Sequence, residues 1–345
     1  KQLAEAFPLQ VADPSKFLGV DVTYSADHKS ISLDVKDFIH HMGKDLGLLD
    51  LPCTRLPFSP NVAHSHGADT GYCTQDEIKS MGCLAWIVGE QAISLKAHHA
   101  RLAQYQGKPT HKWLHEMRRL LKFIFDHADQ FVWTHHNPSL ESQLNVYVDA
   151  SHNDDLDTCG TTIGSVTFNG PSCLRAKSQK KRNIISAGTA GNEARALNEP
   201  LNETLREFEM LSAAEFSFKE PPGLISDNIA ALIMMTGNNL TPACRHIKPK
   251  LLRVRQLYAQ GKLRLGYVPT EHNHADLETK TNFTEERFWY HVRAIQDGNP
   301  ALDKVKWILT EDDVKWLRDP SLRKAADADA FSLFQTPVIT DPPQG

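Results

Sequence analysis

The sequence predicts an α/β protein in which a mixed five-stranded sheet with flanking helices follows an α+β part rich in helices. Apolar and polar side chains alternate over residues 144–149, and two more strand-like runs follow directly. Strand-like and helical stretches then alternate to about residue 280. Period-two alternation indicates strands, and strand–helix alternation is typical of parallel crossovers. We therefore predict an antiparallel meander followed by parallel strands.

Length and composition limit the protein classes that the chain can represent. Its 345 residues favour two domains, and its 41% hydrophobic and 23% charged residues are ordinary for a globular chain. A formal net charge of -4 argues against a uniformly basic nucleic-acid binder. Six cysteines without a C-x-x-C pair predict reduced thiols rather than disulfides or zinc. No apolar run could span a membrane, so we expect a soluble, intracellular protein of undetermined compartment.

The first part, residues 1–140, is predicted to combine a hairpin with helices. Alternation predicts its two strands, and apolar stripes at helical spacing predict the helices. Asp34 and Thr110 are the expected N-caps, since their side chains can accept from free first-turn amides. The predicted elements are strands 16–24 and 30–33, a helix ending at Gly47, a loop over 52–72, helices 76–105 and 110–127, and a polar link over 135–142.

The second part, residues 141–290, holds the predicted sheet, and residues 291–345 form a C-terminal extension. In the extension, Thr310 and Asp313 have the spacing of a capping box and predict one helix. The strands predicted for the second part are 144–149, 161–168, 172–177, 223–227 and 263–268, and its helices are 189–212, 228–236, 243–260 and 274–280.

Four acids occupy comparable places in the second part. Asp149 ends the first strand and Asp227 ends the fourth, whereas Glu193 opens a helical stretch and Asp276 follows the fifth strand. If these elements share one sheet, the four carboxylates can meet at one edge and hold a pair of divalent cations. The alternative is that each acid only caps a helix or ends a strand.

Several short motifs occur in a fixed order from about residue 3 to residue 290. They are Lys16-Phe17-Leu18-Gly19-Val20, the turn from Thr54 to Pro57, Met81-Gly82-Cys83-Leu84-Ala85-Trp86, Pro109-Thr110-His111-Lys112-Trp113, Tyr147-Val148-Asp149-Ala150-Ser151, Ser178-Gln179-Lys180, Ser226-Asp227-Asn228, Arg245-His246-Ile247 and Ala275-Asp276-Leu277-Glu278-Thr279-Lys280. In this order they resemble the downstream half of the Copia-type LTR retrotransposon polyprotein. That region comprises the end of the reverse transcriptase palm, the thumb and connection, and the RNase H domain.

The resemblance implies an RNase H-like fold for residues 141–290 and a site for two Mg²⁺ ions. Asp149 would bridge both ions, Glu193 and Asp227 would hold one, and Asp276 would hold the other. Carboxylates suit this role because magnesium prefers oxygen ligands. His272, or the next histidine along the chain, could shuttle a proton or assist product release.

The sequence also departs from the family pattern. Gly191 stands where the family has a glutamate, and Leu252 stands where it has a histidine. The paired acids at 154–155 and 312–313 lack the flanking apolar strands of a polymerase Tyr-x-Asp-Asp hairpin. The resemblance therefore implies no polymerase site in this sequence.

Two basic runs are the predicted contacts to RNA or an RNA/DNA hybrid. No acid interrupts either run, and such clusters can neutralise phosphates. The alternative is a solvated charged surface. The first run comprises Arg175, Lys177, Lys180, Lys181 and Arg182, and the second comprises Arg245, Lys248 and Lys250, with Arg253 and Arg255 further along.

Three functions remain open at this point. The first is a magnesium-dependent ribonuclease of the RNase H type that cuts the RNA strand of RNA/DNA hybrids. The second is a domesticated, catalytically silent subunit with a structural or RNA-binding role among other protein chains, for example in a ribosome. The third is a fragment of a longer polyprotein. Acids that are clustered and open to solvent would support catalysis, whereas separated acids, or acids paired with lysines, would support the structural role.

Overall fold

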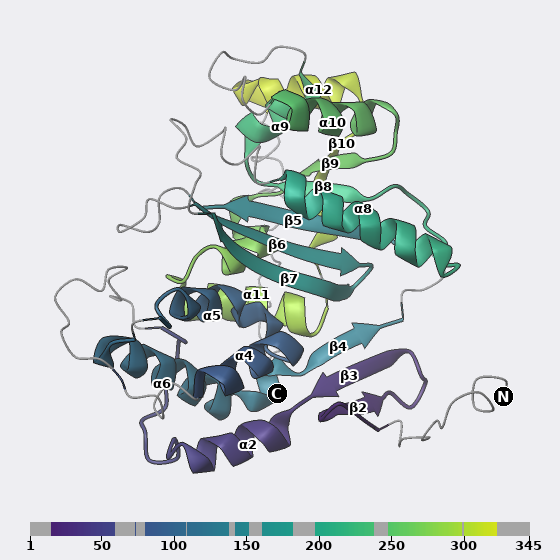
Figure 1. Cartoon of the computed structure of the whole chain (residues 1–345). Coiled ribbons are helices and arrows are strands. Elements are labelled where there is room, and N and C mark those ends of the chain that lie inside the picture. Colours follow the sequence, from purple (N-terminus) through teal and green to yellow (C-terminus); the bar gives the residue numbers. More distant parts are fainter. Residues whose placement is uncertain are drawn as a thin grey trace, which may run out of the picture.

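The computed structural model describes residues 15–58, 73, 80–107, 109–137, 142–151, 161–181, 197–237, 248–298 and 300–322. Its first part combines a four-stranded sheet, of order β1-β2-β3-β4, with four α-helices (Figure 1). The strands are β1 (Lys16–Phe17), β2 (Val20–Tyr24), β3 (Ser30–Asp34) and β4 (Trp133–His136). The helices are α2 (Lys36–Asp45), α4 (Ser80–Glu90), α5 (Lys96–Ala103) and α6 (His111–Asp126), with 3-10 turns η1 (Ile93–Leu95) and η2 (Ala128–Phe131).

The second sheet has the order β10-β9-β8-β5-β6-β7. β5, β6 and β7 form an antiparallel meander, and β8 runs parallel to both β5 and β9. The predicted five-stranded mixed sheet is therefore confirmed, and β10 adds a sixth strand antiparallel to β9. The strands are β5 (Leu144–Ala150), β6 (Thr161–Asn169), β7 (Ser172–Lys181), β8 (Gly223–Ser226), β9 (Arg264–Tyr267) and β10 (Lys306–Ile308).

Within the described part of the chain, five α-helices accompany this sheet, and helix α8 crosses it in Figure 1. The helices are α8 (Asn198–Ala213), α9 (Ile229–Thr236), α10 (Lys248–Ala259), α11 (Glu285–Gln296) and α12 (Glu311–Arg318). The 3-10 turns are η4 (Thr270–His272), η5 (His274–Glu278) and η6 (Leu302–Lys304). The predicted helix starts at residues 76, 189 and 243 lie outside the described residues.

Two predictions for the first sheet are wrong. Residues 16–24 do not form one strand, because Leu18 and Gly19 both have positive φ (50° and 86°) and turn the chain between β1 and β2. Two residues of positive φ suit the tight turns that join antiparallel strands. The predicted polar link at 135–142 contains the end of β4, whose polar residues pair with β3.

The expected caps are mostly confirmed. Thr110 accepts a hydrogen bond from Trp113 N at 3.3 Å, and Thr310 forms a capping box with Asp313. Asp34 is not an N-cap, because α2 starts one residue later, after Val35. The Asp34 carboxylate instead accepts a hydrogen bond from the backbone amide of Lys36.

Both faces of the second sheet are covered at β5, where every residue except Asp149 is buried. Val146 and Val148 pack in a core with residues of α8, α9, α10 and α12. Tyr147 faces the other way, into a core that also contains the helices of the first part and α11. Gln296 of α11 connects the two parts because its Nε2 donates to the carbonyl oxygens of Gln91 and Phe131, at 2.9 and 2.7 Å. The divisions after residues 140 and 290 stay predictions.

Among the described residues, no helix has the length and apolar character needed to cross a bilayer.

Candidate active site

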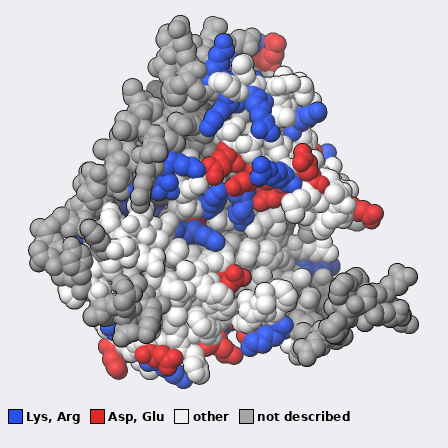
Figure 2. Space-filling view, in the orientation of Figure 1, with Lys and Arg blue, Asp and Glu red and all other residues white. Residues whose placement is uncertain are grey.

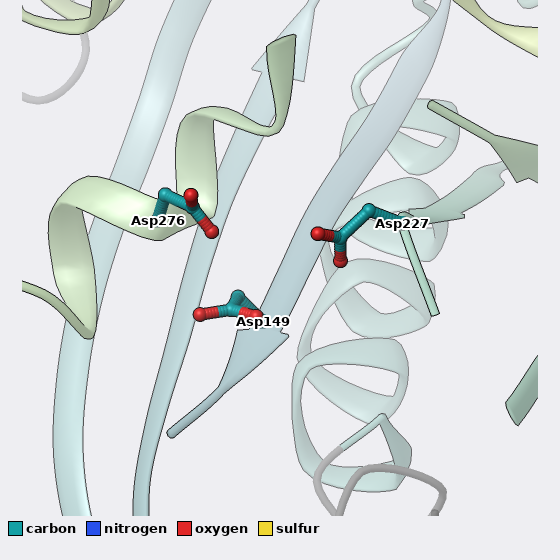
Figure 3. Close-up of side chains that lie close together, drawn as sticks. All are labelled: Asp149, Asp227 and Asp276. Atoms are coloured by element: carbon teal, nitrogen blue, oxygen red, sulfur yellow. The ribbon is translucent and has the colours of Figure 1, made fainter. Parts of the chain in front are cut away.

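Three of the four predicted acids lie together (Figure 3). One carboxylate oxygen from each of Asp149, Asp227 and Asp276 lies within 4.8 Å of the other two. Asp149 lies near the end of β5, Asp227 follows β8, and Asp276 lies in η5. Because β5 and β8 are parallel neighbours, their carboxyl ends meet at the same edge of the sheet. We call these three residues the acid cluster.

Asn273 holds the acid cluster in place, although none of the sequence motifs described above contains it. Its Nδ2 donates to the carbonyl oxygen of Val148 at 3.2 Å and to Asp227 Oδ1 at 3.1 Å. Its Oδ1 accepts from the amide of Ala275 at 3.2 Å and so caps η5. One fully buried side chain thus links β5, Asp227 and the turn that carries Asp276.

Three further side chains contact the acid cluster from the same segment and from α11. Thr279 Oγ1 donates to Asp149 Oδ2. Lys280 Nζ lies 2.7 Å from Asp276 Oδ1 and 3.9 Å from Asp149 Oδ2. Arg287 donates to Asp276 Oδ2 at 2.8 Å. Thr279 and Lys280 belong to the same sequence motif as Asp276, so they could have been predicted to lie near the site. Arg287 lies outside every motif and could not.

Burial and mutual repulsion determine the charge state of the cluster. The pKa of Asp149 is raised by burial and by Asp227, although Lys280 opposes the shift. The pKa of Asp276, which has no exposed surface, is likewise raised by burial and by Asp149. Burial lowers the pKa of Lys280, but Asp149 and Asp276 outweigh this effect and raise it overall. Asp149 and Asp276 therefore resist ionisation unless cations accompany them.

The remaining predicted catalytic residues have different outcomes. Glu193 lies outside the described residues. His272 is half-buried, and its Nδ1 lies 2.8 Å from Tyr290 Oη. His274 is fully buried with its Nδ1 3.1 Å from His291 Nδ1, so it cannot exchange protons directly with solvent. His272 therefore remains the candidate for proton transfer.

The first basic run contains no acid of its own, but the fold brings acids from another element against it. Its contact with nucleic acid stays a prediction. Helix α8 places three glutamates against β7, and each of them pairs with a cation of the run. Positive and negative side chains are correspondingly intermixed where α8 crosses the sheet (Figure 2). The pairs, which we call the β7–α8 ladder, are Arg175 with Glu203 and Glu207, Lys177 with Glu199 and Glu203, and Lys181 with Glu199.

The other predicted nucleic-acid contacts are placed only in part. Lys180 donates to Gln104 Oε1 at 2.9 Å. Lys248 and Lys250 are exposed at the start of α10. Arg182 and Arg245 lie outside the described residues. The exposed lysines of α10 are thus better placed than the ladder to meet a phosphate backbone.

The acid cluster has the chemistry of a site for a hard divalent cation. All three groups are carboxylates, the ligands that magnesium and calcium prefer. Asp149 and Asp227 fit a cation best, because both oxygens of Asp276 already contact Lys280 or Arg287.

Two curated protein sequences are similar to part of the chain. The Retrovirus-related Pol polyproteins from transposons RE2 and RE1 of Arabidopsis thaliana are 24% and 23% identical to the chain over 180 residues. Each match covers 52% of this chain and 12% of the relative, so the chain corresponds to a small part of their length. No family model matches the chain.

Solved structures similar to the chain include RNase H domains and a viral reverse transcriptase. The N-terminal RNase H domain of a Mycobacterium tuberculosis protein covers 45% of this chain and 99% of its own, with 13% identity and a TM-score of 0.30. A foamy viral protease-reverse transcriptase in complex with double-stranded DNA covers 74% of this chain and 37% of its own, with 11% identity and a TM-score of 0.38.

Proposed function

We propose that the chain is a ribonuclease of the RNase H type. Its sequence is similar to part of the retrotransposon Pol polyproteins, and its second sheet has the mixed strand arrangement that the family resemblance implies. It would cleave the RNA strand of RNA/DNA hybrids with Mg²⁺ as the metal. The observation that carries this proposal is the acid cluster, in which three carboxylates from separate elements lie within 4.8 Å of one another. Buried like charges are costly, and they are typical of functional sites.

The side chains around the cluster have positioning roles in this proposal. A divalent ion held by Asp149 and Asp227 would lower the pKa of a bound water and so supply a nucleophile near neutral pH. The Thr279 hydroxyl orients Asp149, and the Asn273 amide orients Asp227. His272 would carry protons between the site and solvent. Lys248 and Lys250 would contact the phosphate backbone of the hybrid.

The decisive experiment is a cleavage assay on a hybrid labelled in its RNA strand, in the presence of Mg²⁺. We expect Asp149→Asn to lower the rate by at least about 100-fold, because it removes the ligand at the centre of the cluster. Asp50→Asn is the matched control, since it makes the same chemical change at an exposed position and should leave the rate unchanged. Equal cleavage by the wild type and Asp149→Asn would exclude the proposal.

One observation favours a second candidate function. Lys280 and Arg287 both form ion pairs with Asp276, as expected if the site no longer needs its metals. The chain would then be a catalytically silent subunit that binds RNA or protein in a larger assembly. In that case the wild type would not cleave the hybrid at any Mg²⁺ concentration but would still bind it in EDTA.

A further inference from the structure

Charge is distributed unevenly within the acid cluster. Asp276 has a cationic group against each of its oxygens, Lys280 Nζ at 2.7 Å and the Arg287 guanidinium at 2.8 Å. Asp227 instead accepts from the neutral amide of Asn273. Lys280 also reaches toward Asp149, at 3.9 Å. The protein's own cations therefore neutralise one side of the site, while the other side has an uncharged donor.

We propose that the Lys280 ammonium takes the place of the second divalent cation, so that the site binds a single metal ion. This inference rests on the proposed function. The ammonium lies between Asp149 and Asp276, where it contacts both carboxylates that a second ion would share. Its positive charge would stabilise negative charge that develops on the phosphate during cleavage, without transfer of a proton.

A count of formal charges supports a single ion. Among the described residues, the three ionised carboxylates of the acid cluster face the two cations Lys280 and Arg287, which leaves one negative charge. One divalent ion already exceeds that charge. A second ion would have to displace Lys280 from Asp276 or accept the repulsion of an ammonium only a few ångströms away.

The alternative is that Lys280 only stabilises the fold. Asp276 and Lys280 are four residues apart, a spacing at which ion pairs often form on exposed helix surfaces and contribute little. Here the carboxylate is completely buried, so some partner is required on structural grounds alone. A purely structural lysine would change stability when replaced, but it would not set the number of metal ions bound.

The test is therefore a count of bound metal ions. Mn²⁺ serves as the probe because it takes the same oxygen ligands and is detected by electron paramagnetic resonance. We expect the full-length wild type to bind one Mn²⁺ at this site. Lys280→Met should bind two, with the affinity of the second site raised at least about tenfold by loss of the repelling charge. Asp276→Asn in the Lys280→Met background should remove the second site.

Controls separate this effect from a change in folding. Lys315→Met disrupts an exposed ion pair with Asp312 and should leave Mn²⁺ binding as in the wild type. If Lys280→Met does not fold, Lys280→Gln provides the same test, because its amide is neutral but can still donate to Asp276. Two Mn²⁺ ions in the wild type, or one in both the wild type and the variant, would overturn the role of Lys280. Absence of binding by both would overturn the proposed function as well.

Discussion

The acid cluster and the β7–α8 ladder organise charge in opposite ways. In the ladder, three cations of β7 face three glutamates of α8, and every member has an oppositely charged partner. In the acid cluster, three carboxylates share two cations, and both of these contact Asp276. The ladder is balanced and partly exposed, whereas the cluster has excess negative charge and is largely buried.

This difference separates a structural use of charge from a functional one. Balanced, partly exposed pairs add modestly to stability and require no further ligand. A buried excess of one sign lowers stability unless a ligand of the opposite sign is bound, and such an excess is typical of functional sites. The following predictions test the contrast, beginning with the largest expected effect.

Glu278, in the same 3-10 turn as Asp276, is a further buried carboxylate. It is fully buried, and burial raises its pKa to about 8, with Lys96 only partly opposing the shift. Because the folded state holds the proton more tightly than the unfolded chain, the stability from this group is present at low pH and is lost as the pH rises toward 8. We expect the wild type to lose about 3 kcal/mol relative to Glu278→Gln between pH 5 and 8.

Chemical denaturation of both proteins at several pH values measures this difference. His98, His274 and His291 have lowered pKa values because of burial, so they destabilise the fold as the pH falls below about 6.5. Their effect is common to both proteins and cancels in the comparison. A constant difference in unfolding free energy from pH 5 to 8 would show that Glu278 ionises as easily in the fold as in the unfolded chain.

Metal binding at the acid cluster should raise the free energy of unfolding. At a Mg²⁺ concentration about 100 times the dissociation constant, we expect the wild type to gain about 2.7 kcal/mol of stability. Asp149→Asn should gain much less, and Asp50→Asn should gain as much as the wild type. Thermal unfolding in Mg²⁺ and in EDTA measures the gain, and equal gains for the wild type and Asp149→Asn would place the bound ion elsewhere.

The sequence predicted the sheet and three of its acids because both depend on local patterns. Alternation located the strand that carries Asp149, and motif order located Asp227 and Asp276. The partners of these acids depend on tertiary structure and were missed. Arg287 reaches Asp276 only because α11 packs beside η5, and Asn273 links three elements that are distant in sequence.

The same limit explains why the sequence did not predict the glutamates that face the first basic run or the additional sixth strand. A run without acids looks free to bind phosphate until α8 folds over β7, and no local pattern in the run predicts that contact. The sixth strand is only three residues long, too short for period-two alternation to reveal. Its pairing with β9 places it at the sheet edge.

The ladder should respond to mutation as a structural feature. Arg175→Met removes the ion-pair partner that Glu203 and Glu207 share, so we expect a loss of about 1.5 kcal/mol in unfolding free energy, as for two partly exposed pairs. The salt dependence of hybrid binding should stay unchanged.

Lys250→Met, at an exposed position on α10, should have the opposite effects. It should leave the unfolding free energy unchanged, and it should lower by about 1 the slope of log binding constant against log salt concentration for the hybrid. A lower salt slope for Arg175→Met than for the wild type would support the predicted contact of Arg175 with nucleic acid.

The smallest expected effects are two stability changes of opposite sign, one in the acid cluster and one in the ladder. In EDTA at pH 8, Asp149→Asn should be about 1 kcal/mol more stable than the wild type, because it removes a buried charge whose pKa is raised. Glu199→Gln should be less stable by only about 0.5 kcal/mol. Burial raises the pKa of Glu199, but Lys181 and Lys177 outweigh it and lower the pKa overall, and solvent screens these pairs because the side chain is 39% exposed. Both differences should shrink as the pH falls toward 4, where the two carboxyl groups become protonated in the unfolded chain. Urea unfolding at pH 8 and pH 4 measures both, and two changes of the same sign would mean that the cluster and the ladder use charge in the same way.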